Sequence, residues 1–264
     1  MTEERRPETR LATHSDDELY YRDAPLVGEL LGNVTFTEAM FAHILGRPPA
    51  PGQVKILDAV LVALMEHGLT PSAISSRLTY HSAPEALQSA VAAGLLNVGS
   101  QFVGTMENSA LLLRRLVDGN EDFEIAARRE IEDYRSRKEP LPGFGHHLHK
   151  PDDPRSPRLF AIARAEAGVT GTYIDALERF SVVVDTVLGK HLTINATGAV
   201  AAVLMEIDVA PEIMRGFAVI SRAAGLVAHI HEEQLNPTAR TIWDTVENAV
   251  PYAGSAPVGK TSKP

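Results

Sequence analysis

The sequence contains no cysteine, although it is 264 residues long. A chain without thiols cannot form disulfides, iron–sulfur clusters or zinc ribbons, and it cannot use a thiolate nucleophile. Proteins that do without disulfides are typical of reducing compartments. We therefore expect a cytoplasmic protein that is stabilised by a hydrophobic core, which a chain of this length can bury.

Positive charge and long apolar runs are also scarce. Lys and Arg number 25 against 34 Asp and Glu, a net charge of −9 that argues against nucleic-acid binding. An anionic small molecule is still compatible with this balance, because a few arginines can converge in one cleft. The longest apolar runs, such as residues 198–205, are far shorter than the roughly 18 residues of a membrane span. The first ten residues, MTEERRPETR, have no apolar segment like that of a signal peptide, so we expect no membrane association.

Apolar residues recur at helical spacing over nearly the whole chain. Thr35 and Glu38 form a capping-box pattern at the start of one such segment. Residues 173–188 carry another apolar stripe, within which residues 182–184 alone also fit a strand. No segment alternates with a period of two between hairpin turns. The sequence predicts an all-α fold.

Charged and loop-forming residues divide the chain. Residues 118–140 are dense in charge, and a loop rich in Pro, Gly and His follows them. Long apolar helices return afterwards, which is the pattern of a small domain inserted into a larger one. We predict a polar N-terminal arm, a large helical domain in two segments, a small helical domain between those segments and a flexible tail. Their respective bounds are residues 1–19, 20–105 with 198–254, 106–197 and 255–264.

Three of the ten histidines, His146, His147 and His149, lie within four residues of this loop. They are open to three interpretations: polar loop residues, metal ligands, or donors to the oxygens of a substrate. A metal needs several converging ligands, and no HExxH motif or second ligand cluster supplies them, so we expect no metal. Arg155 follows in the same loop and favours the substrate interpretation, because a guanidinium binds a carboxylate through two hydrogen bonds.

Three residues outside the loop are open to a structural or a ligand-binding interpretation. His67 stands just before Gly68, where it fits either the C-terminus of a helix or a ligand site. Arg222 lies within the apolar run of residues 217–230, where a charge is costly unless it is paired. It therefore meets either a protein carboxylate or a ligand anion. His229 lies seven residues later on the same face and also fits a buried structural histidine.

Several ordered blocks of the sequence resemble the citrate synthase family. GFGHHLHKPDDPR, at residues 143–155, is similar to the GxGHxxxxxxDPR loop of that family. The other blocks that follow the order of the family are residues 26–51, 66–73, 97–110 and 194–234. The resemblance covers residues 20–252. Within the family the chain resembles the short citryl-CoA lyase branch, including the C-terminal lyase module of ATP-citrate lyase.

The resemblance implies a homodimer with large and small helical domains and an active site in the cleft between them. It implies that His67 and His146 are catalytic residues that bind substrate, and that His146 polarises the substrate oxygen. Arg155 and Arg222 match arginines that hold the carboxylates of an oxaloacetate-type substrate. Arg240, in ARTIWD, matches an arginine that reaches the active site of the partner subunit.

The resemblance also implies a CoA thioester as substrate or product, with no permanently bound cofactor. The residues that it places in CoA binding are Arg135, Arg137, Lys138, Gly143, Phe144 and Gly145. The residues that it adds to substrate binding are His147 and Phe102.

Two departures from the family bear on the reaction. Synthases carry a catalytic His in a GPLHGGAN-like segment, where this chain reads GSQFVGTM with Phe102 at that position. The lyase module also has Phe there, so this change favours a lyase. The catalytic carboxylate of the family lies in NVDG, whereas this chain reads NATG and has Thr197 in its place. A threonine hydroxyl cannot serve as a base near neutral pH, and Glu107 or a water held by Thr197 is a candidate replacement.

The leading hypothesis is a citryl-CoA lyase-like enzyme that cleaves a β-hydroxyacyl-CoA to acetyl-CoA, or another acyl-CoA, and a keto acid. The first alternative is a condensing acyltransferase of the citrate synthase type, which runs the same chemistry in reverse. The second alternative is an acyl-CoA or dicarboxylate binding protein without catalysis. The expected partners are these small molecules and a second copy of the chain, with no nucleic acid and no membrane.

Overall fold

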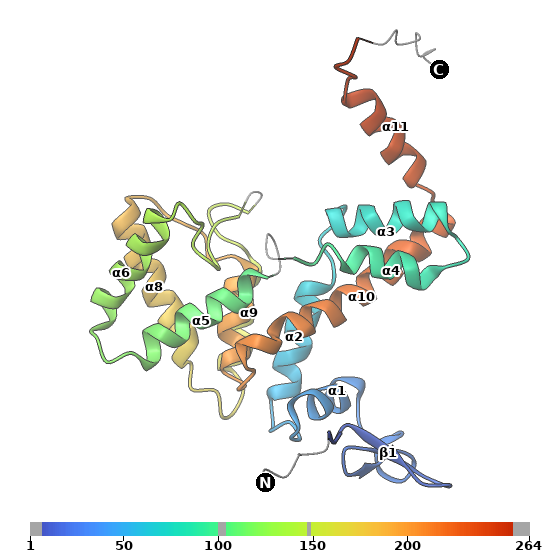
Figure 1. The fold of residues 1–264 in the computed structure, drawn as a ribbon. Coiled ribbons are helices and arrows are strands. Elements are labelled where there is room, and N and C mark those ends of the chain that lie inside the picture. Colours follow the sequence, from blue (N-terminus) through green and yellow to red (C-terminus); the bar gives the residue numbers. More distant parts are fainter. Residues whose placement is uncertain (1–6, 100–103, 147–148, 256–264) are drawn as a thin grey trace, which may run out of the picture. The chain divides into compact units, whose positions relative to one another are not determined.

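The computed structural model describes residues 7–99, 104–146 and 149–255, and these residues are mostly helical (Figure 1). The helices are α1 (Phe36–Leu45), α2 (Gln53–Met65), α3 (Pro71–Ser82), α4 (Leu87–Leu95), α5 (Thr105–Asp118), α6 (Phe123–Ser136), α7 (Arg155–Arg164), α8 (Thr172–Leu188), α9 (Ala196–Met205), α10 (Pro211–Leu235) and α11 (Ala239–Ala249). A short π-helix, η1 (Leu26–Leu30), and three short strands precede them. The predicted all-α class is confirmed.

Contacts within the chain divide it into two compact units. Unit 1 comprises residues 1–63 and 100–218, and unit 2 comprises residues 64–99 and 219–264. The bounds of these units differ from those of the large and small domains predicted from the sequence. The two units do not test that division, which stays a prediction.

Helix α9 forms the centre of unit 1, where α5, α7 and α8 pack around it (Figure 1). Nine of its ten residues are buried, among them Val200 and Leu204. Burying an aliphatic side chain of that size stabilises the fold by about 1.5–3 kcal/mol. Thr197 is the exception, since it is only partly buried. The buried helix therefore holds the first turn, which carries Thr197, in a fixed place.

Two local patterns predicted from the sequence are confirmed. Thr35 caps α1, because its hydroxyl accepts the Glu38 amide at 3.2 Å while the Glu38 carboxylate accepts the Thr35 amide at 2.7 Å. The apolar stripe of residues 173–188 lies in α8, and residues 182–184 are helical within it. Periodicity and capping residues were sufficient for both helices.

The N-terminal segment contains a small antiparallel sheet that the sequence does not predict. Strands β1 (Ala12–His14), β2 (Leu19–Tyr21) and β3 (Ala24–Pro25) pair in that order. The turn between β2 and β3 has Arg22 at φ 54°, in the left-handed region that favours glycine. Its guanidinium donates to the His43 carbonyl from Nε at 3.0 Å and from Nη2 at 2.7 Å. The expectation of no hairpin is therefore wrong. The turn has no typical turn sequence and is held by the tertiary contact between Arg22 and His43, which the sequence does not indicate.

Unit 2 contains α3, α4, α11 and the C-terminal part of α10. A Cβ on Gly94 of α4 would lie 2.6 Å from the Leu226 side chain, so α4 packs tightly against α10. A Cβ on Gly225 would lie 2.1 Å from the Met65 carbonyl oxygen, so α10 also touches the end of α2 through its backbone. By length and hydropathy α10 alone among the described helices could cross a membrane, although its Arg222 and His229 are buried within the protein.

Candidate active site

The loop that carries GFGHH is fixed to the segment that enters α9. Phe144 and Ile194 form an isolated antiparallel bridge. Around it, the Gly145 amide donates to the Thr193 carbonyl at 2.8 Å, and the Asn195 amide donates to the Gly143 carbonyl at 3.0 Å. The Asn195 side chain donates to the Gly145 carbonyl at 3.0 Å. These bonds bring together two sequence blocks that lie about 50 residues apart.

Two glycines make this approach feasible. A Cβ on Gly143 would lie 2.8 Å from the Gly198 Cα, and a Cβ on Gly198 would lie 2.6 Å from the Gly143 carbonyl oxygen. Gly143 and Gly145 also have φ values of 84° and 81°, which other residues adopt only with strain. The first turn of α9 therefore lies directly against the loop backbone.

Arg155 is held by a buried carboxylate two residues before it. Its Nε and Nη2 donate to Asp153 at 3.0 and 2.8 Å, and the carboxylate also accepts the Ala196 amide at 3.1 Å. Burial raises the pKa of Asp153, but the hydrogen bonds and charge of Arg155 outweigh it and hold the pKa below its usual value. Because Asp153 takes the Nε–Nη2 edge, the Nη1–Nη2 end of the guanidinium is the part of Arg155 that is left for a ligand carboxylate.

His146 is held by a backbone amide three residues later in the loop. The His149 amide donates to His146 Nδ1 at 3.0 Å, and the two rings lie 4.4 Å apart. An imidazole whose Nδ1 accepts a hydrogen bond carries its proton on Nε2 when it is neutral. His146 therefore presents an N–H donor, which suits the polarisation of a substrate oxygen.

His146, His149 and Asp153 also form a cluster in which one potential ligand atom of each lies within 4.8 Å of the others. The Asp153 oxygens are already engaged. Oδ1 accepts the Arg155 amide and Nε, and Oδ2 accepts Arg155 Nη2 and the Ala196 amide. A carboxylate has about four acceptor positions, so an ion would have to displace one of these donors. The cluster fits the binding of an anion by Arg155 better than the binding of a cation.

Thr197 takes part in a directional chain of hydrogen bonds. Its hydroxyl donates to Asn195 Oδ1 at 2.7 Å, and the Thr105 hydroxyl lies 2.8 Å from it. Asn195 Oδ1 also accepts the Gly198 amide, and its Nδ2 is bound to Gly145, so the amide orientation is fixed. The single proton of Thr197 is thus directed to Asn195, and Thr105 is the donor to Thr197. Thr197 is an acceptor towards any further group.

Glu107 and Arg137, one of the predicted CoA-binding residues, each form ion pairs within the protein. Glu107 pairs with Arg215 at 3.3 Å. Arg137, at the C-terminus of α6, pairs with Asp133 at 3.1 Å and with Glu139 at 3.4 Å. Arg135 and Lys138, which also belong to the predicted CoA-binding set, are exposed beside Arg137. These three cations share one helix end in unit 1, while Gly143, Phe144 and Gly145 lie in the loop.

The remaining predicted site residues that the structure describes lie in unit 2. His67 follows α2, where Glu66 Oε1 accepts the amides of His67 and Gly68 at 2.7 and 2.6 Å. Arg222 is 8% exposed and lies on α10. Arg240 is exposed at the start of α11, where it pairs with Asp244 at 2.9 Å.

Two predicted residues, Phe102 and His147, lie outside the described residues. Sequence reasoning missed the residues that hold the predicted ones in place, chiefly Asp153, Asn195 and Glu66. Asp153 could have been found from its spacing to Arg155 in DDPR. The roles of Asn195 and Glu66 depend on contacts with residues such as Gly145 and His229, which no local pattern indicates.

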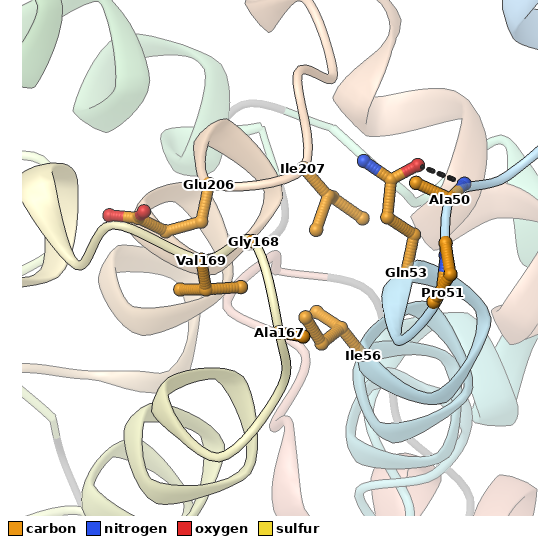
Figure 2. Close-up of a pocket in the computed structure, with 9 residues that line it drawn as sticks. All are labelled: Ala50, Pro51, Gln53, Ile56, Ala167, Gly168, Val169, Glu206 and Ile207. Carbon is orange, nitrogen blue, oxygen red and sulfur yellow. Dashed lines mark hydrogen bonds between the residues drawn. The ribbon is translucent and has the colours of Figure 1, made fainter.

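A small cavity elsewhere in unit 1 is lined by residues that stabilise the fold. It has a volume of about 50 Å³ and lies between residues 50–56, residues 167–169 and the end of α9 (Figure 2). Glu206 is the one titratable residue in its lining. Its carboxylate accepts the amides of Gly171 at 2.9 Å and Tyr173 at 2.6 Å, which caps the start of α8. We therefore place no chemistry in this cavity.

The fold and the loop define a class of protein. The family described as citrate synthase, C-terminal domain, matches residues 15–243, and the chain belongs to this family. The chain is similar to the citryl-CoA lyase from Hydrogenobacter thermophilus, with 32% identity, a TM-score of 0.84 and 97% of each chain covered.

Longer proteins of the same fold are also similar to the chain. ATP citrate lyase from Methanosaeta concilii, solved as a D541A mutant with (3S)-citryl-CoA, has a TM-score of 0.76 at 17% identity, and the match covers 96% of this chain and 43% of that one. ATP-citrate synthase subunit 1 from Sordaria macrospora is 23% identical over 270 residues, which cover 94% of this chain and 39% of that protein. The chain thus spans about two-fifths of the length of the ATP-citrate synthases that it matches.

Proposed function

We propose that the chain is a carbon–carbon lyase of the citryl-CoA lyase type, which cleaves a β-hydroxyacyl-CoA to acetyl-CoA, or another acyl-CoA, and a keto acid. The geometry of the GFGHH loop carries this proposal. The loop presents an N–H of His146 and an arginine held by Asp153, next to the first turn of α9. The likeness to a citryl-CoA lyase over 97% of both chains supports the same class of reaction.

The reaction breaks the bond between the carbon that bears the hydroxyl and the α-carbon of the thioester. The electron pair stays with the thioester as an enolate, and the hydroxyl loses its proton and becomes the keto oxygen. A donor aimed at that oxygen stabilises the charge that develops on it, and His146 Nε2–H is our candidate for this role. Arg155 and Arg222 hold the carboxylates, and His67 binds the same keto-acid part.

Two protons must move, one from the hydroxyl and one to the enolate. His146 in its Nε2–H tautomer is a donor and not a base, and Thr197 directs its proton to Asn195. Neither side chain is thus a base for the hydroxyl proton, so proton transfer must use a group of the substrate or a water, towards which Thr197 can only accept a hydrogen bond. The lack of a base in these two side chains favours one further candidate function, a protein that binds an acyl-CoA or a dicarboxylate without catalysis.

One experiment separates the candidates. Purified protein is mixed with citryl-CoA, then with acetyl-CoA and oxaloacetate, while free thiol and keto acid are followed. Cleavage of citryl-CoA supports the lyase, and net condensation supports the synthase alternative. Thermal stabilisation by CoA without turnover of either mixture supports the binding protein and contradicts the lyase on this substrate.

We further propose that CoA binds along the loop and the α6 end with Arg135, Arg137 and Lys138, and that the protein is a cytoplasmic homodimer. Arg240 would then act in the active site of the partner subunit. Light scattering at micromolar concentration tests the dimer. A monomer would contradict the shared-site assignment of Arg240.

A further inference from the structure

A chain of polar groups in unit 2, buried at Arg77, His229 and Glu233, begins at the turn that carries His67. Glu66 folds back so that Oε1 accepts the amides of His67 and Gly68. Its other oxygen, Oε2, lies 2.9 Å from His229 Nε2. Burial raises the pKa of Glu66, but the His67 amide and the contact with His229 outweigh it, so the pKa lies below its usual value. The carboxylate that fixes the His67 backbone is therefore also in direct polar contact with His229.

The tautomer of His229 is set from its other side. Nδ1 accepts Arg77 Nε at 3.0 Å and lies 2.8 Å from Arg77 Nη2. An arginine can only donate, so Nδ1 is unprotonated and the ring proton is on Nε2, which faces Glu66. His229 is 9% exposed and Arg77 is 1% exposed. Arg77 thus orients the ring whose proton faces Glu66.

Arg77 also connects this chain to the start of α11. Its Nη1 donates to Glu233 at 2.9 Å and to the Thr238 hydroxyl at 3.2 Å, and Nη2 pairs with Glu232. Glu233 Oε1 in turn accepts the amides of Thr238 and Ala239, both at 2.7 Å. One carboxylate thereby binds the backbone that immediately precedes Arg240.

Stability alone is a weak reason for such an arrangement. Replacing a buried ion pair by apolar residues of similar volume is often neutral or stabilising, because burying charges is costly. A network of directional polar contacts instead favours one geometry. One end of this network binds the backbone of His67, and the other binds the backbone just before Arg240, two residues that the proposed function places at the substrate.

We propose that Arg77 and His229 are positioning residues of the active site. Through Glu66 they fix the His67 turn, and through Glu233 they fix the start of α11 with Arg240. The proposal rests on the proposed function only in that His67 and Arg240 bind substrate. Helix α3 and the end of α10 would then support substrate binding without touching the substrate themselves.

The test uses two substitutions of His229 that each keep one of its contacts. His229→Gln keeps an N–H at the reach of Nε2 for Glu66. His229→Asn keeps an acceptor at the reach of Nδ1 for the buried Nε of Arg77. Losing that acceptor costs more than losing the contact with Glu66, because the Glu66 carboxylate is exposed and can bind water. We expect His229→Asn to be the more stable variant in thermal unfolding and the less active one, with kcat/KM for citryl-CoA at least about tenfold below that of His229→Gln. If the less stable of the two variants is also the less active one, Arg77 and His229 have a structural role only and the proposal is wrong.

A matched control comes from unit 1, where Arg115 pairs with the buried Glu130 through Nε and Nη2 at 3.0 and 2.8 Å. Arg115→Met is expected to lower the melting temperature and to leave kcat/KM unchanged. An equal loss of kcat/KM in Arg115→Met and His229→Asn would contradict positioning.

Amide hydrogen exchange supplies a readout that needs no substrate. The His67 and Gly68 amides are expected to exchange faster in His229→Asn than in His229→Gln. Equal exchange in both variants would overturn the proposal. If the exchange differs as expected while the wild-type protein does not cleave citryl-CoA, then the lyase function fails and the positioning network stands.

Discussion

Thr197→Asp is the sharpest test of what this site does, because it restores the carboxylate of the family motif. A positioned general base contributes roughly 10²–10⁴-fold, or about 3–5 kcal/mol of barrier. An impaired lyase that lacks only its base should recover a gain of that size with citryl-CoA. We expect no such gain, because the surroundings of Thr197 are arranged for a hydroxyl.

The geometry gives the reason. An Asp side chain at this position would put a carboxylate oxygen near Asn195 Oδ1, which now accepts the Thr197 proton at 2.7 Å. Thr105, now 2.8 Å from the Thr197 hydroxyl, would donate to the new carboxylate and hold it within the protein. The fold should tolerate the change, since losing one hydrogen bond costs about 1 kcal/mol while a negative charge in the first turn of α9 gains about 0.3–1 kcal/mol.

The assay measures citryl-CoA cleavage by free thiol in the wild type, Thr197→Asp and the uncharged control Thr197→Asn. Thermal unfolding of all three verifies that each is folded. We expect both variants to cleave citryl-CoA within about threefold of the wild type. A gain of about 10² or more in Thr197→Asp alone would refute this reasoning and identify an ordinary lyase that has lost its base.

Three other substitutions test separate parts of the site. Arg222→Ala should weaken dicarboxylate binding about 100-fold in calorimetry, the equivalent of about 3 kcal/mol for a buried charge, and should leave CoA binding intact. Unchanged dicarboxylate affinity, or loss of folding, would contradict its assignment to a ligand. Gly198→Ala should cost about 1–3 kcal/mol in denaturant unfolding, because its Cβ would lie 2.6 Å from the Gly143 carbonyl oxygen. A wild-type midpoint would show that the loop can move away. The lowered pKa of Asp153 adds stability that is present above its unfolded pKa, near 3.8, and is lost as the pH falls through the lower folded value. Urea unfolding between about pH 2 and pH 6 should therefore show a weaker pH dependence in Asp153→Asn than in the wild type, and parallel curves would contradict this account.

Local signals in the sequence were sufficient for the helices and for the loop. The capping box at Thr35 and the stripe that became α8 depend only on residues within one helix, and both are confirmed. The small sheet was missed because its strands are two or three residues long and Arg22 occupies a turn position that usually has glycine. Periodicity has too few residues to act on in such strands.

The support of the site residues could not be predicted for a different reason. Arg77 and Glu233 are 156 residues apart in sequence, and the sequence of α3 does not indicate that its arginine is buried. Gly143 and Gly198 were visible as motif glycines, but their contact follows only from the packing of the loop on α9. Pairings across such separations are set by the tertiary fold.

The burial of α9 has a consequence for how this protein could change its reaction in evolution. Nine of the ten residues are buried, and the one that is partly accessible, Thr197, lies in the first turn of the helix, beside the loop of His146. A single codon at position 197 can therefore exchange one polar group for another without disturbing the buried interior of the helix. Selection for a new acyl-CoA would need few steps there, while the interior positions of the same helix would drift little.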